Sequence, residues 1–439
     1  MKGPVIATKE LGFSYQNGSP ALRGVSLEVH RGRKIAFLGP NGAGKSTLFL
    51  HFNGILRPKK GEVRYNDVPL RYDQRSLALL RQDIAMVLQN PDDQIFSSTV
   101  EEDVAFGPMN LGLERAEVER RVDVSLHLVG MEGLRSRPTQ QLSFGQRKRV
   151  SLAGALAMRP KVLIMDEPTA GLDSEMVHEL LELSDELNHA GMTMIMSTHD
   201  IETAYEWADE MVVLIGGEVV FSGTPEDLFD RHMLLDRLRI VYPYAVRMNQ
   251  QLHYRTGRPE RPFPRTLVEL TEKCFPSPAT GAHEGSELSH ARLSAGTLYI
   301  ADVDDPGLPG QVDDIAGRMQ DLHRSSGVYG AKARRLVRDG RLDVHHPFHA
   351  LENALLQVSV GKDFLLYTDT SLISLVGREL AKVEGRVGLR TRVVFSAHAT
   401  RGGDRPQEAD AGSIREIKSQ EDHGEDINGR PLEGRFGRS

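Results

Sequence analysis

The chain has 439 residues, 39% of them hydrophobic and 26% charged, with a net charge of −7. This length predicts two or three domains rather than one. The acidic balance argues against a general nucleic-acid binder, because no bulk basic excess is present to collect phosphates. Cys274 is the single cysteine, so no intrachain disulfide can form and a reducing cytosol is expected. Neither a signal peptide nor an apolar run of about 18 residues is evident, so we expect other subunits to supply any membrane channel.

The first segment, Val5 to Val29, alternates short β-type runs with turns, which predicts an antiparallel sheet. Tyr15 lies in this segment, where its ring would either stack on a purine base or simply pack inside the domain. Further along, the run from Glu62 to Asp67 is typical of a hairpin.

Between these segments the apolar run Lys34 to Leu38 leads into the sequence GPNGAGKST, which has the pattern G-x-x-x-x-G-K-[ST]. Its glycines let successive backbone N–H groups and the start of a helix near Ser46 face a polyphosphate. Lys45 would supply charge to the β- and γ-phosphates of ATP, and the Ser46 hydroxyl would ligate Mg²⁺. The predicted nucleotide-binding residues here are Gly39, Pro40, Asn41, Gly42, Ala43, Gly44, Lys45, Ser46 and Thr47.

The next apolar run ends at Gln89, and Asn90-Pro91 begins a loop. A glutamine at this position can reach a metal-bound water with its amide oxygen and retract when the loop moves, or it can be a plain polar strand cap. Residues from Ser97 to about Met131 are predicted to be helical, with their charged side chains on solvated faces.

A second helix start follows at the sequence LSFGQ. Ser143 is the predicted N-cap of a helical run over 147–158, and Gly145 lies in its first turn. With Gln146, these residues form a second helix N-terminus suited to phosphate.

An apolar strand beginning at Val162 ends in two carboxylates, Asp166 and Glu167, which would be costly to bury without a cation or water to use them. We expect Asp166 to be the Mg²⁺ partner, directly or through water, and Glu167 to be the base that polarises the attacking water. The alternative is that both acids merely cap the strand. His199 follows another buried strand, expected to be parallel to the first, and is predicted to contact the γ-phosphate and help hold the water; the alternative for a lone histidine is a structural role.

Over roughly its first 230 residues the chain resembles the ATP-binding subunits of ABC transporters. The resemblance rests on motifs in the family's order and spacing: GPNGAGKST (Walker A), Gln89 (Q-loop), LSFGQ (signature), VLIMDE (Walker B), AGLD (D-loop) and His199 (switch histidine). It implies that Tyr15 stacks on adenine and that two such domains join head to tail. Each ATP would then lie between the Walker A motif of one subunit and Ser143–Gln146 of the other. Dimerisation would also explain why one chain carries two helix N-termini suited to phosphate, one near Ser46 and one at Ser143.

A narrower resemblance is to the ATPases of energy-coupling-factor importers, especially the cobalt and nickel branch. It is carried by the stretches 89–96, 142–150 and 223–229. The resemblance implies two membrane partners, a transmembrane coupling subunit and a substrate-binding subunit, and places the coupling contact around Gln89 to Glu102. Pro91, Ile95 and Phe96 would form an exposed apolar docking patch there, or else they pack within the loop.

The composition changes after about Leu235. Residues 236–290 are predicted to be a linker, because the part from Tyr242 to His290 is rich in Pro, Gly, Arg and His and has at most one expected short helix, Thr266 to Cys274. Residues 291–400 alternate apolar strands with helical patterns and are expected to form an accessory α/β domain, possibly regulatory. The expected strands are 297–301, 364–367 and 391–395, and the expected helices are 311–323, 330–338, 348–358 and 372–383. The tail, 401–439, has the composition of a disordered segment.

A histidine cluster stands out in the accessory domain. His345, His346 and His349 precede a predicted helix, and imidazoles at this spacing could coordinate Ni²⁺ or Co²⁺, although solvated histidines at a helix start are the simpler interpretation.

The sequence therefore predicts a P-loop NTPase of ABC type over 1–235, an α/β fold with a mixed sheet, an antiparallel β subdomain and a helical subdomain. We expect an ATPase with ATP and Mg²⁺ as cofactors, peripheral at the cytoplasmic face of the cell membrane, with a second ATPase subunit and membrane subunits as partners and no nucleic acid. Cobalt or nickel import is the favoured function. The alternatives are the same role in vitamin uptake, and a soluble ABC ATPase outside transport.

Overall fold

The computed structural model describes residues 3–16, 18–238, 240–274, 296–306, 308, 312, 315, 319, 325–347, 349–359, 362–387, 392–395 and 408–409. Contacts divide the chain into a first unit, Met1–Tyr244, and a second, Ala245–Ser439. Most of the predicted helix 311–323, nearly all of the tail 401–439 and the linker segment 275–290 lie outside the described residues.

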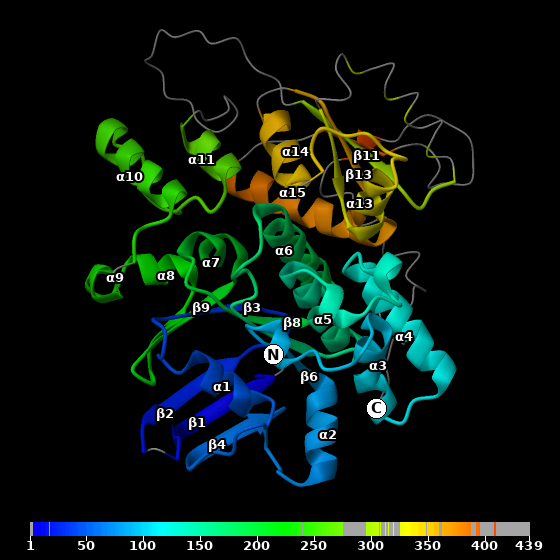
Figure 1. Ribbon diagram of the computed structural model, residues 1–439. Coiled ribbons are helices and arrows are strands. Elements are labelled where there is room, and N and C mark those ends of the chain that lie inside the picture. The colour runs from blue at the N-terminus through cyan, green and yellow to red at the C-terminus, as the bar shows by residue number, and fades with distance from the viewer. Residues whose placement is uncertain are drawn as a thin grey trace, which may run out of the picture. The chain divides into compact units, whose positions relative to one another are not determined.

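Two sheets form the frame of the first unit (Figure 1). The antiparallel sheet has the order β2-β1-β4-β5, and the larger sheet has the order β10-β9-β3-β8-β7-β6. The strands are β1 Ile6–Ser14, β2 Pro20–Val29, β3 Lys34–Leu38, β4 Lys60–Tyr65, β5 Val68–Pro69, β6 Ile84–Val87, β7 Val162–Asp166, β8 Thr193–Ser197, β9 Glu210–Ile215 and β10 Glu218–Gly223. The predicted antiparallel segment and the hairpin at β4–β5 are both confirmed.

The larger sheet is parallel except for the hairpin of β9 and β10. Its central strands β7 and β8 are buried along their whole length, which suits their continuous apolar sequences. Because β3, β8 and β7 are parallel neighbours, their carboxyl ends meet at one edge of the sheet. The segments that follow these strands carry Gly39, His199 and Glu167 respectively.

The helices of the first unit are α1 Lys45–Phe52, α2 Gln74–Asp83, α3 Val100–Asn110, α4 Arg115–Leu128, α5 Phe144–Ala157, α6 Ser174–His189, α7 Ile201–Trp207, α8 Pro225–Phe229 and α9 His232–Leu238. A helical subdomain is formed by α3, α4 and α5, which pack on one another (Figure 1). The predicted helical segment 97–131 is thus two helices. Ser143 caps α5 as predicted, and it shares a reciprocal capping box with Gln146.

The second unit contains α10 Tyr244–Thr256, which begins at the boundary residue, and α11 Leu267–Cys274. The prediction of at most one short helix between 242 and 290 is therefore wrong. Helix α10 buries Val246 and Asn249 among its many polar residues, and the Asn249 side chain is hydrogen-bonded to the Glu260 carbonyl oxygen and to Lys273 Nζ, so packing and polar contacts accompany this helix.

A five-stranded sheet with the order β12-β13-β11-β14-β15 forms the core of the second unit, and all pairs except β14–β15 are parallel. Its elements are β11 Thr297–Asp302, β12 Ser326–Tyr329, α13 Ala331–Arg338, α14 Ala350–Ser359, β13 Phe364–Thr368, α15 Ile373–Val387, β14 Arg392–Phe395 and β15 Glu408–Ala409. The expected α/β layer is present. The sequence did not predict strand β12 or the two-residue strand β15, which lies within the expected disordered tail.

The histidine cluster lies before α14 in this unit. The rings of His345 and His346 are 4.7 Å apart, and His349 Nδ1 lies 3.5 Å from a carboxylate oxygen of Glu352. Among the described residues, no group of three or more His, Cys, Asp or Glu side chains is placed to hold a metal ion. The structure therefore gives the metal hypothesis no support.

Candidate functional site

The loop between β3 and α1 has the backbone that the glycine pattern predicts. Gly39, Gly42 and Gly44 all have positive φ, and a Cβ on Gly39 would lie 2.2 Å from the carbonyl oxygen of Leu214. Gly44 is the N-cap of α1 and offers no side chain to cap the helix, and no acidic residue stands in its first turn. The first N–H groups of α1 are thus left for an anion.

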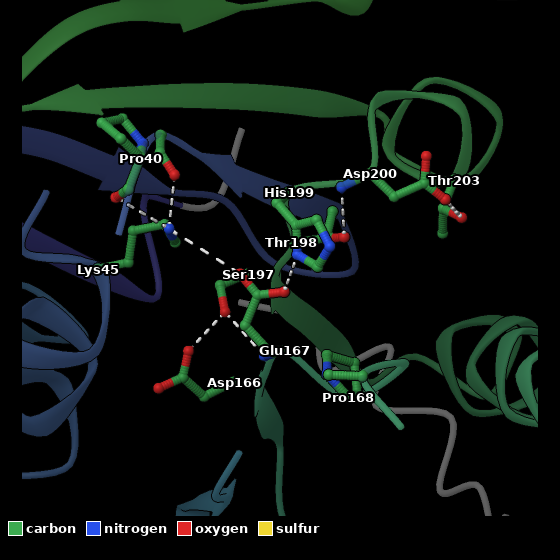
Figure 2. A network of polar contacts seen from close by, with 12 residues as sticks. Pro40, Lys45, Asp166, Glu167, Pro168, Ser197, Thr198, His199, Asp200 and Thr203 are labelled. Carbon is green, nitrogen blue, oxygen red and sulfur yellow. Dashed lines mark hydrogen bonds and ion pairs between the residues drawn. The ribbon is translucent and has the colours of Figure 1, made fainter. Parts of the chain in front are cut away.

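Lys45 lies at the centre of the site. Its side chain is 7% exposed, and its Nζ donates to the carbonyl oxygens of Gly39, at 2.6 Å, and Pro40, at 3.4 Å (Figure 2). The same Nζ is 3.9 Å from Glu167 Oε1. Lys45 therefore joins the loop to the carboxylate pair at the end of β7.

Ser197 fixes the two carboxylate residues relative to each other, because it is paired directly with Asp166 in the parallel register of β7 and β8. Its hydroxyl donates to Asp166 Oδ1 at 2.5 Å and accepts the backbone N–H of Glu167 at 2.8 Å. Ser197 is fully buried, and Asp166 and Glu167 are 5% and 6% exposed. The sequence analysis missed Ser197, although its place at the end of a buried strand, two residues before His199, is the signal that points to it.

Glu167 has an uncommon backbone conformation, and one of its carboxylate oxygens lacks a hydrogen bond among the described residues. Its φ is +46°, in the left-handed region that non-glycine residues rarely occupy. His199 Nδ1 lies 2.9 Å from Glu167 Oε2, so the histidine meets the carboxylate (Figure 2). The predicted contact of His199 with a γ-phosphate stays a prediction. Glu167 Oε1 is buried and has no hydrogen-bond partner within the described part of the chain. That oxygen is therefore left for a group from outside the protein.

A cleft of about 1090 Å³ opens beside this network. It is lined by the start of the phosphate loop, by the turn 169–171, by His199 and by the segment after α9 that includes Ile240 and Val241. The start of the phosphate loop and His199 therefore face one accessible cleft, whereas Glu167 is not among the residues that line it.

Other predicted site residues lie around this centre. Tyr15 is partly exposed, and its hydroxyl is 3.0 Å from the Thr47 hydroxyl. Ser46 and Asn41 are exposed at the loop. Gln89 is exposed two residues after β6, which ends at Val87 rather than at Gln89 as expected. Gln94, which the sequence analysis overlooked, anchors the following loop by hydrogen bonds to Leu88, Met86 and Ser151.

The start of α5 packs on the turn after Glu167. A Cβ on Gly145 would lie 2.4 Å from the Met176 sulfur, and a Cβ on Gly171 would lie 2.8 Å from the Phe144 ring. Lys148, also missed from sequence, donates from α5 to carbonyl oxygens of this turn. Burial lowers the pKa of the Lys148 ammonium to about 8, and the attraction of Glu167 opposes this shift.

Comparison with known proteins agrees with this geometry. Residues 22–170 match the family model described as ABC transporter. The chain is 40% identical over 382 residues to the energy-coupling factor transporter ATP-binding protein EcfA2 of Methanospirillum hungatei, covering 85% of this chain and 92% of that protein. The chain belongs to the ABC transporter ATP-binding proteins. Like its relatives, this energy-coupling factor ATPase is an enzyme that binds and hydrolyses ATP.

Two further likenesses each cover 58% of this chain. EcfA of Methanocaldococcus jannaschii, another energy-coupling factor ATPase, is 47% identical over 255 residues, which cover 58% of this chain and 91% of that protein. The solved structure of cbiO1 from Clostridium perfringens, described as part of the ABC transporter complex cbiONQ, is 39% identical and covers 58% of this chain and 97% of that one, with a TM-score of 0.49. Within the described residues of this ATPase, no helix has both the length and the apolar character to span a membrane.

Proposed function

We propose that this protein energises the import of cobalt or nickel ions across the cell membrane, from a peripheral position at its cytoplasmic face. The observation that carries the ATPase part of this proposal is the arrangement at Glu167: one carboxylate oxygen contacts His199, and the other is buried, 3.9 Å from Lys45 Nζ, with no hydrogen bond within the described residues. A base in this position can activate a water molecule for attack on a phosphate held by the loop.

The nucleotide would lie along the loop from Gly39 to Thr47. The positive φ values and the uncapped start of α1 fit a polyphosphate that approaches the backbone closely. Lys45 would then exchange its carbonyl contacts for phosphate oxygens, and the exposed Tyr15 ring would stack on the adenine.

Ser46, Asp166 and Gln89 would hold Mg²⁺. Their hydroxyl, carboxylate and amide oxygens are ligand types that Mg²⁺ prefers, and Ser197 already orients Asp166. The bound ion would neutralise charge on the phosphates. In this arrangement Glu167 takes the proton of the water, and His199 holds the carboxylate in place and contacts the γ-phosphate.

A second copy or a paralogue would complete the site. Ser143, Gly145 and Gln146 lie at the start of α5, where Ser143 is exposed, Gln146 is half-buried and Gly145 is buried. This helix start would cover the ATP bound by the other subunit. ATP would join the two subunits, and hydrolysis would separate them.

An aromatic patch on the helical subdomain supports contact with a membrane subunit. Phe96, Phe106 and Met109 are 64%, 45% and 63% exposed, and the two phenylalanine rings pack edge to face with centroids 4.5 Å apart. Pro91 is buried and Ile95 is half-buried, so the docking patch expected from the sequence is revised to these three residues. Apolar groups gathered on a surface in this way are typical of a protein interface.

The cargo is proposed from the resemblance of 89–96, 142–150 and 223–229 to the cobalt and nickel branch. The test is reconstitution of the ATPase in vesicles with a transmembrane coupling subunit and a substrate-binding subunit from the same organism, followed by uptake of radioactive cobalt and nickel. We expect ATP-dependent uptake that stops in Glu167→Gln. Uptake of a vitamin instead would change the cargo and keep the ATPase role, whereas failure of the chain to sediment with membranes that contain those subunits would contradict transport.

The patch can be tested separately. Phe106→Ser should weaken copurification with the membrane subunits and leave the basal ATPase rate unchanged. Leu79→Ser, which replaces a side chain that is 61% exposed on α2, is the matched control and should keep both properties.

A further inference from the structure

Lys148 is a charged residue buried where no nucleotide is expected to reach it. It lies in the second turn of α5 and is only 5% exposed. A lysine is rarely buried to this extent unless its ammonium group has partners. The partners here identify what the residue does.

The hydrogen bonds of the Lys148 ammonium group go to one short turn. Its Nζ donates to the carbonyl oxygens of Glu167 at 3.1 Å, Pro168 at 2.8 Å and Ala170 at 2.7 Å. An ammonium group has three protons, so these acceptors use its full donor capacity. Figure 2 shows Pro168 directly after Glu167, at the point where the chain leaves β7.

This turn needs to be held, because Glu167 has a left-handed backbone. Such a conformation in a non-glycine residue persists only where the surroundings impose it. Ser197 holds the N–H of Glu167 at 2.8 Å, and Lys148 holds its carbonyl oxygen. The two flanking peptide groups of Glu167 are therefore fixed from β8 on one side and from α5 on the other.

We propose that Lys148 is a positioning residue for ATP hydrolysis, which keeps the Glu167 carboxylate at the reacting water by clamping the turn 167–170. This inference rests on the proposed role of Glu167 as the base. Lys148 touches neither nucleotide nor water in this arrangement and acts only through the backbone of the turn. Lys148 lies on α5, and α5 begins at Ser143, which is proposed to cover the ATP of the other subunit. Through Lys148, α5 therefore connects that surface to Glu167, the base proposed to act on the ATP bound by the same chain.

The test compares Lys148→Met with Lys161→Met in the full-length protein. Met is an unbranched side chain of similar size, but it donates no hydrogen bond and carries no charge over the Phe144 ring. Lys161 is 56% exposed near the opposite end of β7, where it pairs with Asp83. We expect kcat of Lys148→Met to fall at least about tenfold, with KM and ATP affinity within about threefold of wild type, because a small displacement of a reacting group is costly. Lys161→Met should behave as wild type.

A double variant separates positioning from general damage. If Lys148 acts through Glu167, adding Lys148→Met to Glu167→Gln should slow hydrolysis by no more than about twofold beyond Glu167→Gln alone. An undiminished kcat in Lys148→Met, an equal loss of kcat and ATP affinity, or a full additional slowing in the double variant would each overturn the proposal.

Lys148→Gln is a second variant, to be used if Lys148→Met does not fold. Its amide donates two hydrogen bonds from a shorter side chain, so a lowered kcat with unaltered ATP affinity is expected, and wild-type kcat would overturn the clamp. If Glu167→Gln itself hydrolyses ATP normally, the role of Glu167 as the base is what fails, and this result is distinguishable from a failure at Lys148.

Discussion

His199 Nδ1 and Glu167 Oε2 lie 2.9 Å apart, although the two residues are 32 positions apart in the chain. The contact exists because β7 and β8 are parallel neighbours and each residue directly follows, or nearly follows, the end of its strand. It leaves Glu167 with one oxygen in contact with His199 and one buried oxygen that has Lys45 Nζ 3.9 Å away but no hydrogen bond within the described residues.

Glu167→Gln tests the base directly. The amide is nearly the same shape and can stay beside His199, but it cannot accept a proton from water, so hydrolysis should slow by at least about a hundredfold while ATP still binds. Phosphate release measures the rate, and size-exclusion chromatography with ATP should show a trapped dimer. Glu62→Gln, on β4, is the control. Normal hydrolysis in Glu167→Gln would remove the residue from this role, and a monomer with ATP would argue against dimerisation.

Lys45→Ala should act on binding rather than on chemistry. Its ammonium is the charged group placed at the loop, 2.6 Å from the Gly39 carbonyl oxygen, so its loss should weaken ATP affinity at least about tenfold. Titration with a fluorescent ATP analogue measures the effect. Lys60→Ala, at an exposed position of β4, should bind as wild type. Unchanged affinity in Lys45→Ala would count against the assignment of the phosphate loop.

The parts of the site that could be predicted from sequence are those where residue type and chain position agree. Gly39 to Thr47 have a pattern that few other structures need, and Asp166 and Glu167 end a strand too apolar to be exposed. Ser197 and Lys148 carry no such signal. A serine in a strand is ordinary, and only the pairing of β7 with β8 places it against Asp166.

Tertiary packing decides the remaining cases. Lys148 is one of three consecutive basic residues, and only the packing of α5 on the turn 167–170 selects it for burial. Strand β12 was missed because four residues are too few to show a periodic pattern. Its parallel pairing with β13 is what makes this segment a strand. Helix α10 was likewise not predicted, because the residues around its buried Val246 and Asn249 are mostly polar.

His51 predicts a pH dependence of stability. It is fully buried in α1, its Nδ1 is 2.7 Å from the Thr47 carbonyl oxygen, and burial lowers the pKa of its imidazole below 6.5. As the pH falls below about 6.5 the unfolded chain binds a proton that the folded chain resists, so the free energy of unfolding should fall by up to about 1.4 kcal/mol per pH unit.

His51→Phe should remove that part of the slope between pH 6.5 and 5.5. Trp207 is the single tryptophan and lies in the first unit, so its fluorescence during urea unfolding reports on the relevant unit. His30→Phe, at an exposed position, should keep the wild-type slope. An identical slope in His51→Phe and wild type would show that His51 is not the group responsible.

Gly61 in β4 should be the glycine of the antiparallel sheet that least tolerates a side chain. Its φ is +70°, and a Cβ would lie 2.1 Å from the carbonyl oxygen of Lys9 and 2.3 Å from that of Glu10. Gly61→Ala therefore combines an unfavourable backbone conformation with a clash against β1, and it should lower the free energy of unfolding by more than about 2 kcal/mol.

Two other glycines separate these contributions. Gly112 also has φ of +70° but open space around its Cβ position, so Gly112→Ala should cost about 1 kcal/mol. Gly133 has open space and no left-handed backbone, so Gly133→Ala should stay within about 0.5 kcal/mol of wild type. Urea unfolding followed by Trp207 fluorescence gives all three values. If Gly61→Ala were no more destabilising than Gly112→Ala, the close approach of β1 to β4 at this point would be wrong.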